Sequence, residues 1–382
     1  RMKKIVFIPA CLFSLFFQPP GLNAQYISGA MEFVNPVLEK DSNSISLQYS
    51  SLFYLKDYEY FNKIQTGYTL FGSWHFPRLA IQPNRWLKME AGVLLQKDFG
   101  DMKLSNVLPV FSLQINSRHL RFLFGALEGS QAHHLIEPLM SYDKVIERPV
   151  ETGGQVILNS KKVSADLWID WELRQAVNAS HPEELTAGLN CSYMLTEPGK
   201  SWKVRIPLQL ILPHKGGQLD TNNSPVVTLF NMAGGAEAEY KAPDQRKILQ
   251  EIRAGVFGVK HRTAQRQNTY TFTKGSGLMF NLFLRSRWNL ALLGSYWNGN
   301  KYIAPKGAKI HQSVSSIPGR NYTEKHRELL FLNLIYEKEV FPGFFIDSRY
   351  SPLFDLRKGT YEHAWQMLIS YRNNFGLGRL KK

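Results

Sequence analysis

Two adjacent histidines followed by a glutamate, His133, His134 and Glu137, are the residues that most resemble a metal site in this sequence. Neighbouring histidines do not share a face of a helix or a strand, and no third ligand stands at a spacing typical of zinc. Of the two cysteines, only Cys191 lies outside the first 24 residues, so no thiol cluster is present. We therefore expect these side chains to be polar residues of a long loop, and we expect neither a metal nor a cofactor.

Hydrolysis of a lipid ester would need a hydroxyl within hydrogen-bonding reach of an imidazole, with a third group orienting the ring. His363 has Tyr361 and Trp365 as its neighbours on one face of an extended segment, and it has no serine there. Ser180 and His181 are adjacent in the sequence and therefore poorly placed, and no Gly-x-Ser-x-Gly motif marks a nucleophile turn. The sequence thus predicts that the chain is not an enzyme.

A compact polar segment, residues 214–220, begins with His214 and contains the paired glycines Gly216 and Gly217. Paired glycines form a turn in which the backbone can approach a ligand closely. Two interpretations stay open: a contact with a substrate or partner, or simply a tight loop between two strands.

The elements that must position these residues are extended segments in which apolar and polar side chains alternate. In residues 361–375, one face carries Tyr361, Trp365 and Phe375 with apolar residues between them, and the other face is mostly polar. Side chains of a strand alternate between two faces, so this pattern indicates a strand with one apolar face. Aromatic rings near both ends of that face are typical of a strand whose outer side lies in lipid.

Similar segments follow one another from residue 44 to residue 375, and the connections between them alternate between short and long. Outer-membrane barrels sort their connections in this way, with short periplasmic turns and long outer loops. The sequence therefore predicts an all-β fold, a closed antiparallel transmembrane β-barrel of about sixteen strands. The number would be fourteen if the two segments with the weakest alternation are not strands. The segments are 44–54, 64–76, 86–96, 107–116, 119–128, 154–160, 163–172, 185–195, 202–212, 226–240, 248–259, 276–286, 289–297, 327–338, 344–351 and 361–375.

The two ends of the chain lie outside the predicted barrel. Residues 1–24 combine a basic start, a short apolar run and a small residue before a cleavage point, which predicts a secretory signal peptide. Residues 25–43 show no clear period, and we interpret them as a periplasmic lead-in or a short plug. Residues 376–382 form a basic C-terminal tail.

The net charge of +15 predicts acidic neighbours, and for an exported barrel these are phosphates of outer-membrane lipid, possibly of lipopolysaccharide. No zinc-finger or helix-turn-helix pattern supports nucleic acid. Several basic residues fall in long loops and are candidates for contact with an anionic lipid or ligand: Lys260, Arg262, Arg266, Lys301, Lys306 and Lys309.

Charged residues also occur on the polar faces of the predicted strands, where they would point into the lumen. They could create a transverse field across a pore, or they could form a salt-bridged lattice that fills the interior; both arrangements keep charge away from lipid. The candidates are Lys88, Glu90, Asp166, Asp170, Lys203, Arg205, Glu251, Arg253 and Arg372.

The leader, the strand lengths and the aromatic last strand together resemble outer-membrane β-barrels of Gram-negative bacteria, of the Bacteroidetes type. The end of the last strand is similar to the signal read by the barrel-assembly machinery, with Tyr371 and Phe375 as its aromatics, although Gly376 and six further residues follow. The resemblance implies a multi-pass barrel in the cell outer membrane that this machinery inserts.

A barrel of this size is wide enough for water unless loops fold inward, so porin-like passage of small solutes is the leading function predicted. Residues 129–153 form the natural constriction. The alternative is a non-conducting subunit of an assembly or secretion complex, with a protein partner held by the outer loops. A lipid-modifying enzyme is the third interpretation.

Overall fold

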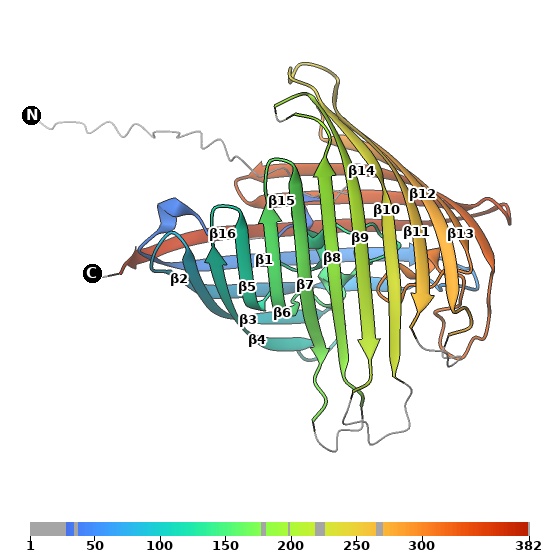
Figure 1. Cartoon of the computed structure of the whole chain (residues 1–382), viewed down its shortest axis with the longest axis horizontal. Helices are drawn as coiled ribbons and strands as arrows, with labels where there is room; N and C mark the ends of the chain where they lie inside the picture. The colour runs from blue at the N-terminus through green and yellow to red at the C-terminus, as the bar shows by residue number, and fades with distance from the viewer. Residues whose placement is uncertain are drawn as a thin grey trace, which may run out of the picture.

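The computed structural model describes residues 28–33, 37–176, 181–197, 199–217, 226–264 and 270–380. Within these residues, sixteen antiparallel strands pair with their sequence neighbours, and β1 pairs with β16, which closes the sheet into a barrel (Figure 1). The strands are β1 (Ser44–Glu59), β2 (Thr69–Gln82), β3 (Leu87–Asp98), β4 (Asn106–Asn116), β5 (Leu120–Ala126), β6 (Thr152–Asn159), β7 (Val163–Leu173), β8 (Glu184–Met194), β9 (Trp202–Lys215), β10 (Val227–Lys241), β11 (Leu249–Thr263), β12 (Lys274–Ser286), β13 (Leu290–Asn300), β14 (His326–Phe341), β15 (Phe344–Asp355) and β16 (Thr360–Arg379).

The closed barrel of sixteen strands confirms the predicted fold, and each predicted segment overlaps one strand. Closure matters because an unpaired backbone group in hydrocarbon costs several kcal/mol, so a sheet in a membrane cannot leave an edge. The ends of the predicted segments were less accurate. β16 continues to Arg379, so most of the predicted tail is strand, and Ser44 pairs with Arg379 across the closure.

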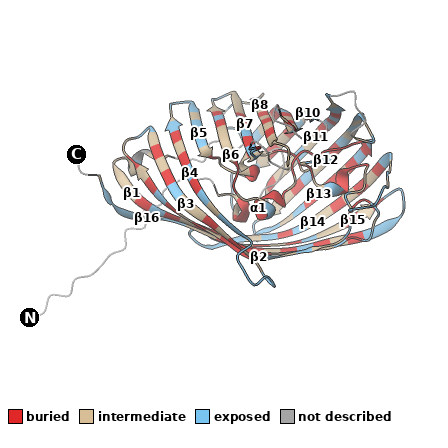
Figure 2. Ribbon diagram, turned by 90° about the horizontal axis from the view of Figure 1, so that it is seen from below, coloured by how far each residue is buried: buried red, intermediate tan, exposed pale blue. Residues whose placement is uncertain are grey.

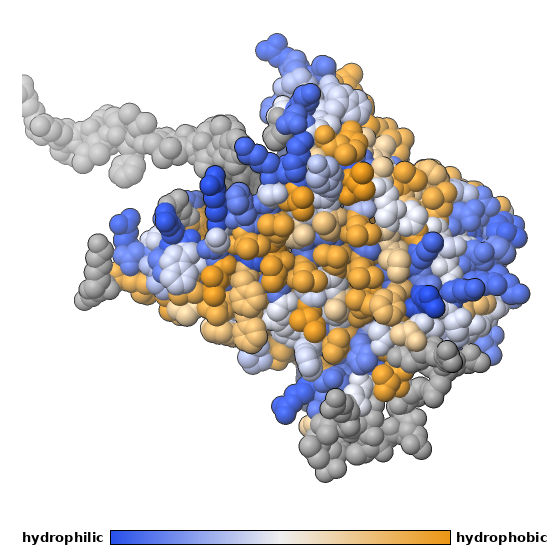
Figure 3. Space-filling view, viewed as in Figure 1, coloured by the Kyte–Doolittle hydropathy of each residue, from blue (hydrophilic) through white to orange (hydrophobic). Residues whose placement is uncertain are grey.

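The outer surface carries an apolar band between more hydrophilic ends (Figure 3). On β12, Leu278, Phe280 and Leu282 are exposed, whereas Met279 and Phe283, on the opposite face of the strand, are buried inside the barrel. The same alternation recurs around the sheet and gives each strand a striped appearance (Figure 2). Alternation with an apolar exterior is what a barrel surrounded by lipid requires.

Two long connections fold back into the lumen and form its core. Leu135, Ile136 and Met140 of the loop 127–151 pack with Tyr302 and Ile310 of the loop 301–325, against inward side chains of the wall. The first loop contains η3 (Ser130–His133) and α1 (Lys144–Glu147), and the second contains η4 (Lys309–His311). Hydrogen bonds join the loops directly: the Tyr302 hydroxyl donates to the carbonyl of Pro138 at 3.0 Å, and Ser141 N–H donates to that of Lys306 at 2.8 Å.

The described residues before the first strand also pack against the inner side of the wall. Their helix η1 (Gly29–Met31) buries Ala30 and Met31 against Trp74 and Leu368, and η2 (Glu39–Asp41) leads into β1. The predicted signal peptide, residues 1–24, lies outside the described residues. In the described part of the chain, no helix has the length and apolar character that crossing a membrane requires.

Candidate active site

The predicted lumen residues of β7 bind the loop 127–151. His133 lies between two carboxylates, with Nδ1 at 2.7 Å from Asp166 and Nε2 at 2.7 Å from Glu151, and its ring stacks on Trp168 at 3.6 Å. Burial disfavours the charged imidazole, but Glu151 and Asp166 outweigh burial and raise the pKa of His133 to about 9. His133 is therefore a buried cation that fixes the loop.

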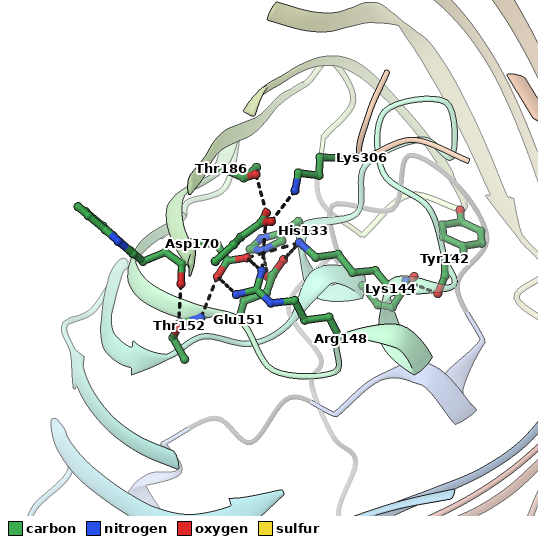
Figure 4. Close-up of polar contacts among 12 residues, drawn as sticks. His133, Tyr142, Lys144, Arg148, Glu151, Thr152, Asp170, Thr186 and Lys306 are labelled. Atoms are coloured by element: carbon green, nitrogen blue, oxygen red, sulfur yellow. Dashed lines mark hydrogen bonds and ion pairs between the residues drawn. The ribbon is translucent and has the colours of Figure 1, made fainter. Parts of the chain in front are cut away.

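The same network extends along the loop (Figure 4). Lys144 Nζ contacts Glu151 at 2.5 Å, and Arg148 contacts both oxygens of Asp170 at 2.5 and 3.0 Å. His133, His134 and Glu137 lie in this long loop, but the loop turns inward, so that His133 is buried and His134 and Glu137 are half-buried. Among the described residues, no group of three or more His, Cys, Asp or Glu could hold a metal ion.

The other predicted lumen residues form ion pairs or lie on the inner surface. Arg205 contacts Glu237 at 2.9 Å, and Arg372 donates to the carbonyl of Gly29 at 3.2 Å. Lys203 is half-buried. Close pairs also join Lys88 to Glu90 at 2.5 Å and Arg253 to Glu251 at 2.6 Å. These ion pairs resemble the salt-bridged lattice that was one of the two interpretations of the sequence. A role of these residues in lining a pore stays a prediction.

The predicted anionic-lipid contacts divide into three groups. Lys260, Arg262, Lys301 and Lys309 are exposed, and Arg266 lies outside the described residues. Lys306 corrects the prediction: its ammonium lies 2.5 Å from Glu172 beside an internal cavity, because the loop 301–325 folds inward. The predicted insertion residues Tyr371 and Phe375 lie on β16, with Phe375 exposed, and their recognition stays a prediction.

A hydroxyl, an imidazole and a carbonyl contact one another where β9 ends and β10 begins. His214 Nδ1 lies 2.7 Å from Thr228 Oγ1, and His214 Nε2 lies 2.8 Å from the carbonyl oxygen of Gly216. A carbonyl only accepts, so Nε2 carries the proton, and Nδ1 of the neutral ring accepts from the Thr228 hydroxyl. A hydroxyl, an imidazole and an acceptor on its second nitrogen are the kinds of group that acyl transfer uses as nucleophile, base and orienting group.

Local backbone geometry sets this arrangement. His214 and Thr228 are direct partners in the β9–β10 ladder. Gly216 adopts φ 107°, a conformation that favours glycine, and its N–H donates to the carbonyl of Glu183 at 2.9 Å. The turn therefore directs the Gly216 carbonyl back towards the ring, and both side chains lie on the outward-facing side of the sheet, half-buried.

Cations lie beside this pair on the same outer face. Arg262 pairs across the ladder with Phe230, and Ala264 N–H donates to the carbonyl of Thr228 at 2.9 Å. Arg262 and Thr228 are thus diagonal neighbours, about 7–8 Å apart in such ladders. Lys260 and Lys274, the latter opposite Arg262, add two further exposed ammonium groups.

An apolar groove of about 610 Å³ runs across the outer face of β10 to β13. Small residues, Ala236, Ala254 and Gly294, form its floor, and the exposed ring of Phe280 forms part of its wall. The groove lies on the strands that carry the cations, further into the apolar band.

The structure contains a second outer-face imidazole near a hydroxyl: His75 Nδ1 lies 2.7 Å from Tyr49 OH. His75 is far down β2 from its outer end at Thr69, roughly 20 Å along the strand at ~3.3 Å per residue. With a strand tilt of about 45°, that is deep in the apolar band. The His214–Thr228 pair lies at the strand ends, at the level of polar lipid groups.

Sequence reasoning singled out His214 but missed Thr228. The search for a dyad looked along single segments, whereas these two residues meet across a ladder between strands. Only the register of β9 against β10 brings them together, and neighbouring-strand alignment of the predicted segments is the signal that could have revealed the pair.

Comparisons with known proteins agree with the barrel fold and also identify the protein family of the chain. OmpT of Vibrio cholerae, an outer membrane protein, in a loop L8 deletion mutant, matches with a TM-score of 0.51 and 9% identity, covering 86% of this chain and all of that one. A BenF-like porin from Pseudomonas fluorescens Pf-5 matches with a TM-score of 0.50 and 9% identity over 88% of this chain and all of that one. At such identities these matches show the fold alone, and no curated protein matches the sequence.

A family described as "Lipid A 3'-O-deacylase-type" matches residues 37–380, and the chain therefore belongs to this family. The protein is a multi-strand β-barrel of the outer membrane, as the sequence predicted. The prediction that it is not an enzyme was wrong, since the family is named for an enzyme activity. The prediction had relied on the absence of a well-placed hydroxyl and imidazole within any single segment, a search that cannot detect pairs formed across two strands.

Proposed function

We propose that this barrel hydrolyses an acyl ester of a phosphorylated lipid in the outer leaflet, at the Thr228–His214 pair. The observation that carries the proposal is the line of contacts from Thr228 Oγ1 through the His214 ring to the Gly216 carbonyl, at 2.7 and 2.8 Å. Membership of the deacylase-type family supports the same reaction class.

The reaction proceeds by acyl transfer in two steps. Thr228 Oγ1 attacks the ester carbonyl carbon while His214 Nδ1 takes the hydroxyl proton, and the Gly216 carbonyl accepts from Nε2–H and stabilises the imidazolium. The ester C–O bond breaks, and the proton passes from His214 to the departing alcohol. Water, deprotonated by His214, then cleaves the acyl-threonine, which releases a fatty acid and restores the hydroxyl.

The surrounding surface favours an anionic lipid. Lys260, Arg262 and Lys274 supply a positive field beside Thr228, suited to phosphate groups of the lipid, which in this membrane include those of lipopolysaccharide. The groove below them is suited to an acyl chain of the same molecule. Recognition would thus require a charged head and an apolar tail together.

Passage of small solutes, which the sequence predicted as the leading function, has less support. The fold neighbours include a BenF-like porin, but two loops with a shared apolar core occupy the lumen here. Attachment of a protein partner through outer loops also stays a prediction. Membrane lipid, rather than a transported solute, is the substrate class proposed.

The experiment measures fatty-acid release by the purified protein in vesicles that contain phosphorylated, multiply acylated glucosamine disaccharide lipid. The wild-type protein should release fatty acid. His214→Gln and Thr228→Val should lower the rate by about 10²-fold or more, the effect of removing a general base or its nucleophile. Heat resistance of the folded band on a gel shows that each variant has formed its barrel.

Matched controls separate this site from other outer-face residues. His75→Gln and Thr69→Val change the same residue types on β2 and should leave the rate within twofold. A rate that falls in His75→Gln and stays unchanged in His214→Gln would move the active site to β1 and β2. No release by the wild-type protein would overturn the proposal.

A further inference from the structure

A polar cavity of about 280 Å³ lies inside the barrel, between the two inward loops and the wall. Its lining includes Tyr68 from the β1–β2 connection, Tyr142 and Glu147 from the loop 127–151, and Lys309 from the loop 301–325. Lys309 and Glu147 are exposed, so solvent reaches the cavity, which is close in size to the smaller ligand sites of proteins. The reaction at Thr228 does not use it.

Two buried hydroxyl groups in the lining have no protein partner. Tyr142 is 5% exposed and Ser295 is 3% exposed, and among the described residues neither Tyr142 OH nor Ser295 Oγ has a hydrogen-bond partner. Burying an unpaired hydroxyl costs free energy, so such groups in a cavity wall indicate a bound polar molecule or water.

Hydrogen bonds and ion pairs hold other polar side chains of the cavity lining in place, so the cavity is preformed. Asp143 accepts from Lys56 at 2.5 Å, from Tyr58 OH at 2.6 Å and from Tyr68 OH at 3.0 Å. Lys306 is held by Glu172 at 2.5 Å. A site whose side chains are already ordered loses little conformational freedom when a ligand binds.

Basic side chains outnumber acidic ones in the lining, and two of them, Lys144 and Arg148, are also paired with carboxylates behind it. Six basic side chains line the cavity, namely Lys56, Lys144, Arg148, Lys306, Lys309 and Arg349, against four acidic ones, namely Glu137, Asp143, Glu147 and Glu172. Burial raises the pKa of Glu137 and that of Glu147, which reduces the negative charge further. Within the lining, Lys309 lies over the Tyr68 ring at 5.8 Å, and among the described residues its ammonium forms no ion pair with a carboxylate.

We infer that this cavity is a binding site for a small hydroxylated anion of monosaccharide size, a sugar carrying one carboxylate or phosphate. Tyr142 and Ser295 would bond its hydroxyl groups, and Lys309 would face its charge. The site is separate from the ester-hydrolysing pair proposed above, on the inner rather than the outer side of the wall.

Isothermal titration of the purified full chain in detergent tests this, with glucose 6-phosphate, glucuronate and neutral glucose as probes. At least one of the two anions should bind at least tenfold more tightly than glucose. Tyr142→Phe and Ser295→Ala, which each remove one hydroxyl and little volume, should weaken binding of the anions about fivefold or more. Lys309→Gln should remove the preference for anions over glucose.

Controls keep the outcomes distinct. Lys301→Gln and Tyr296→Phe change the same residue types outside the cavity and should bind as the wild type does. Fatty-acid release should be unchanged in Tyr142→Phe, so a failure here is separable from a failure of the proposed hydrolysis. Absence of binding by all three probes, or equal affinity in Tyr142→Phe, Ser295→Ala and the wild type, would overturn the inference; binding of phosphate sugar alone or carboxylate sugar alone would identify which anion the site takes.

Discussion

At the scale of single residues, two histidines of this chain differ in what surrounds them. His214 has a hydroxyl on one nitrogen and a backbone carbonyl on the other, the arrangement of a general base. His133 has carboxylates on both nitrogens, the arrangement of a buried cation. Sequence alone showed both as polar loop residues, since the partners Thr228, Glu151 and Asp166 come from other segments of the chain.

The pH dependence of stability follows from His133. Its pKa in the folded chain, about 9, is raised above the usual value of about 6.5, so the stabilisation is complete below pH 6.5 and lost as pH rises through 9. The contribution is up to about 3 kcal/mol. Urea unfolding from vesicles should show a lower free energy of unfolding at pH 9.5 than at pH 6, and His133→Gln should reduce this difference. An identical difference in that variant would contradict the account.

At the scale of elements, the strands were predictable and the loops were not. Alternation along Trp202–Lys215 or Thr360–Arg379 is a local property of the sequence, enforced by lipid on one side, and it identified all sixteen strands. The inward course of the loop 127–151 depends on contacts with residues far away in the sequence, such as Tyr302 with Pro138. No local pattern encodes such contacts, so a filled lumen was only one of two open interpretations, and the internal cavity could not be predicted.

The orientation of strand faces has a direct energetic test. Leu282 is 49% exposed on the outer face of β12, within the apolar band, whereas Met102 is 97% exposed in the β3–β4 connection. Leu282→Arg should lower the free energy of unfolding by about 2–4 kcal/mol, because the charge would lie in hydrocarbon. Met102→Arg should change it by less than about 0.5 kcal/mol. Equal effects in vesicle unfolding would mean that Leu282 does not face lipid.

At the scale of the whole molecule, the barrel is a closed wall with a packed interior and an apolar band on its exterior. Side chains of both inward loops share one apolar cluster with Trp168 and Trp297 of the wall. We expect the wild-type protein in planar bilayers to show no porin-like conductance steps. Deletion of residues 129–149 should produce steps, because it removes one of the two loops; steps of equal size in both proteins would contradict the packed lumen.

The central claim is that the Thr228 hydroxyl carries the acyl group between lipid and water. The most direct measurement is mass spectrometry of the protein quenched in acid during turnover of the acylated lipid. The account predicts one added acyl group, located on the peptide that contains Thr228 and absent from Thr228→Val. An acyl group on a different residue, or undiminished fatty-acid release by Thr228→Val, would contradict it.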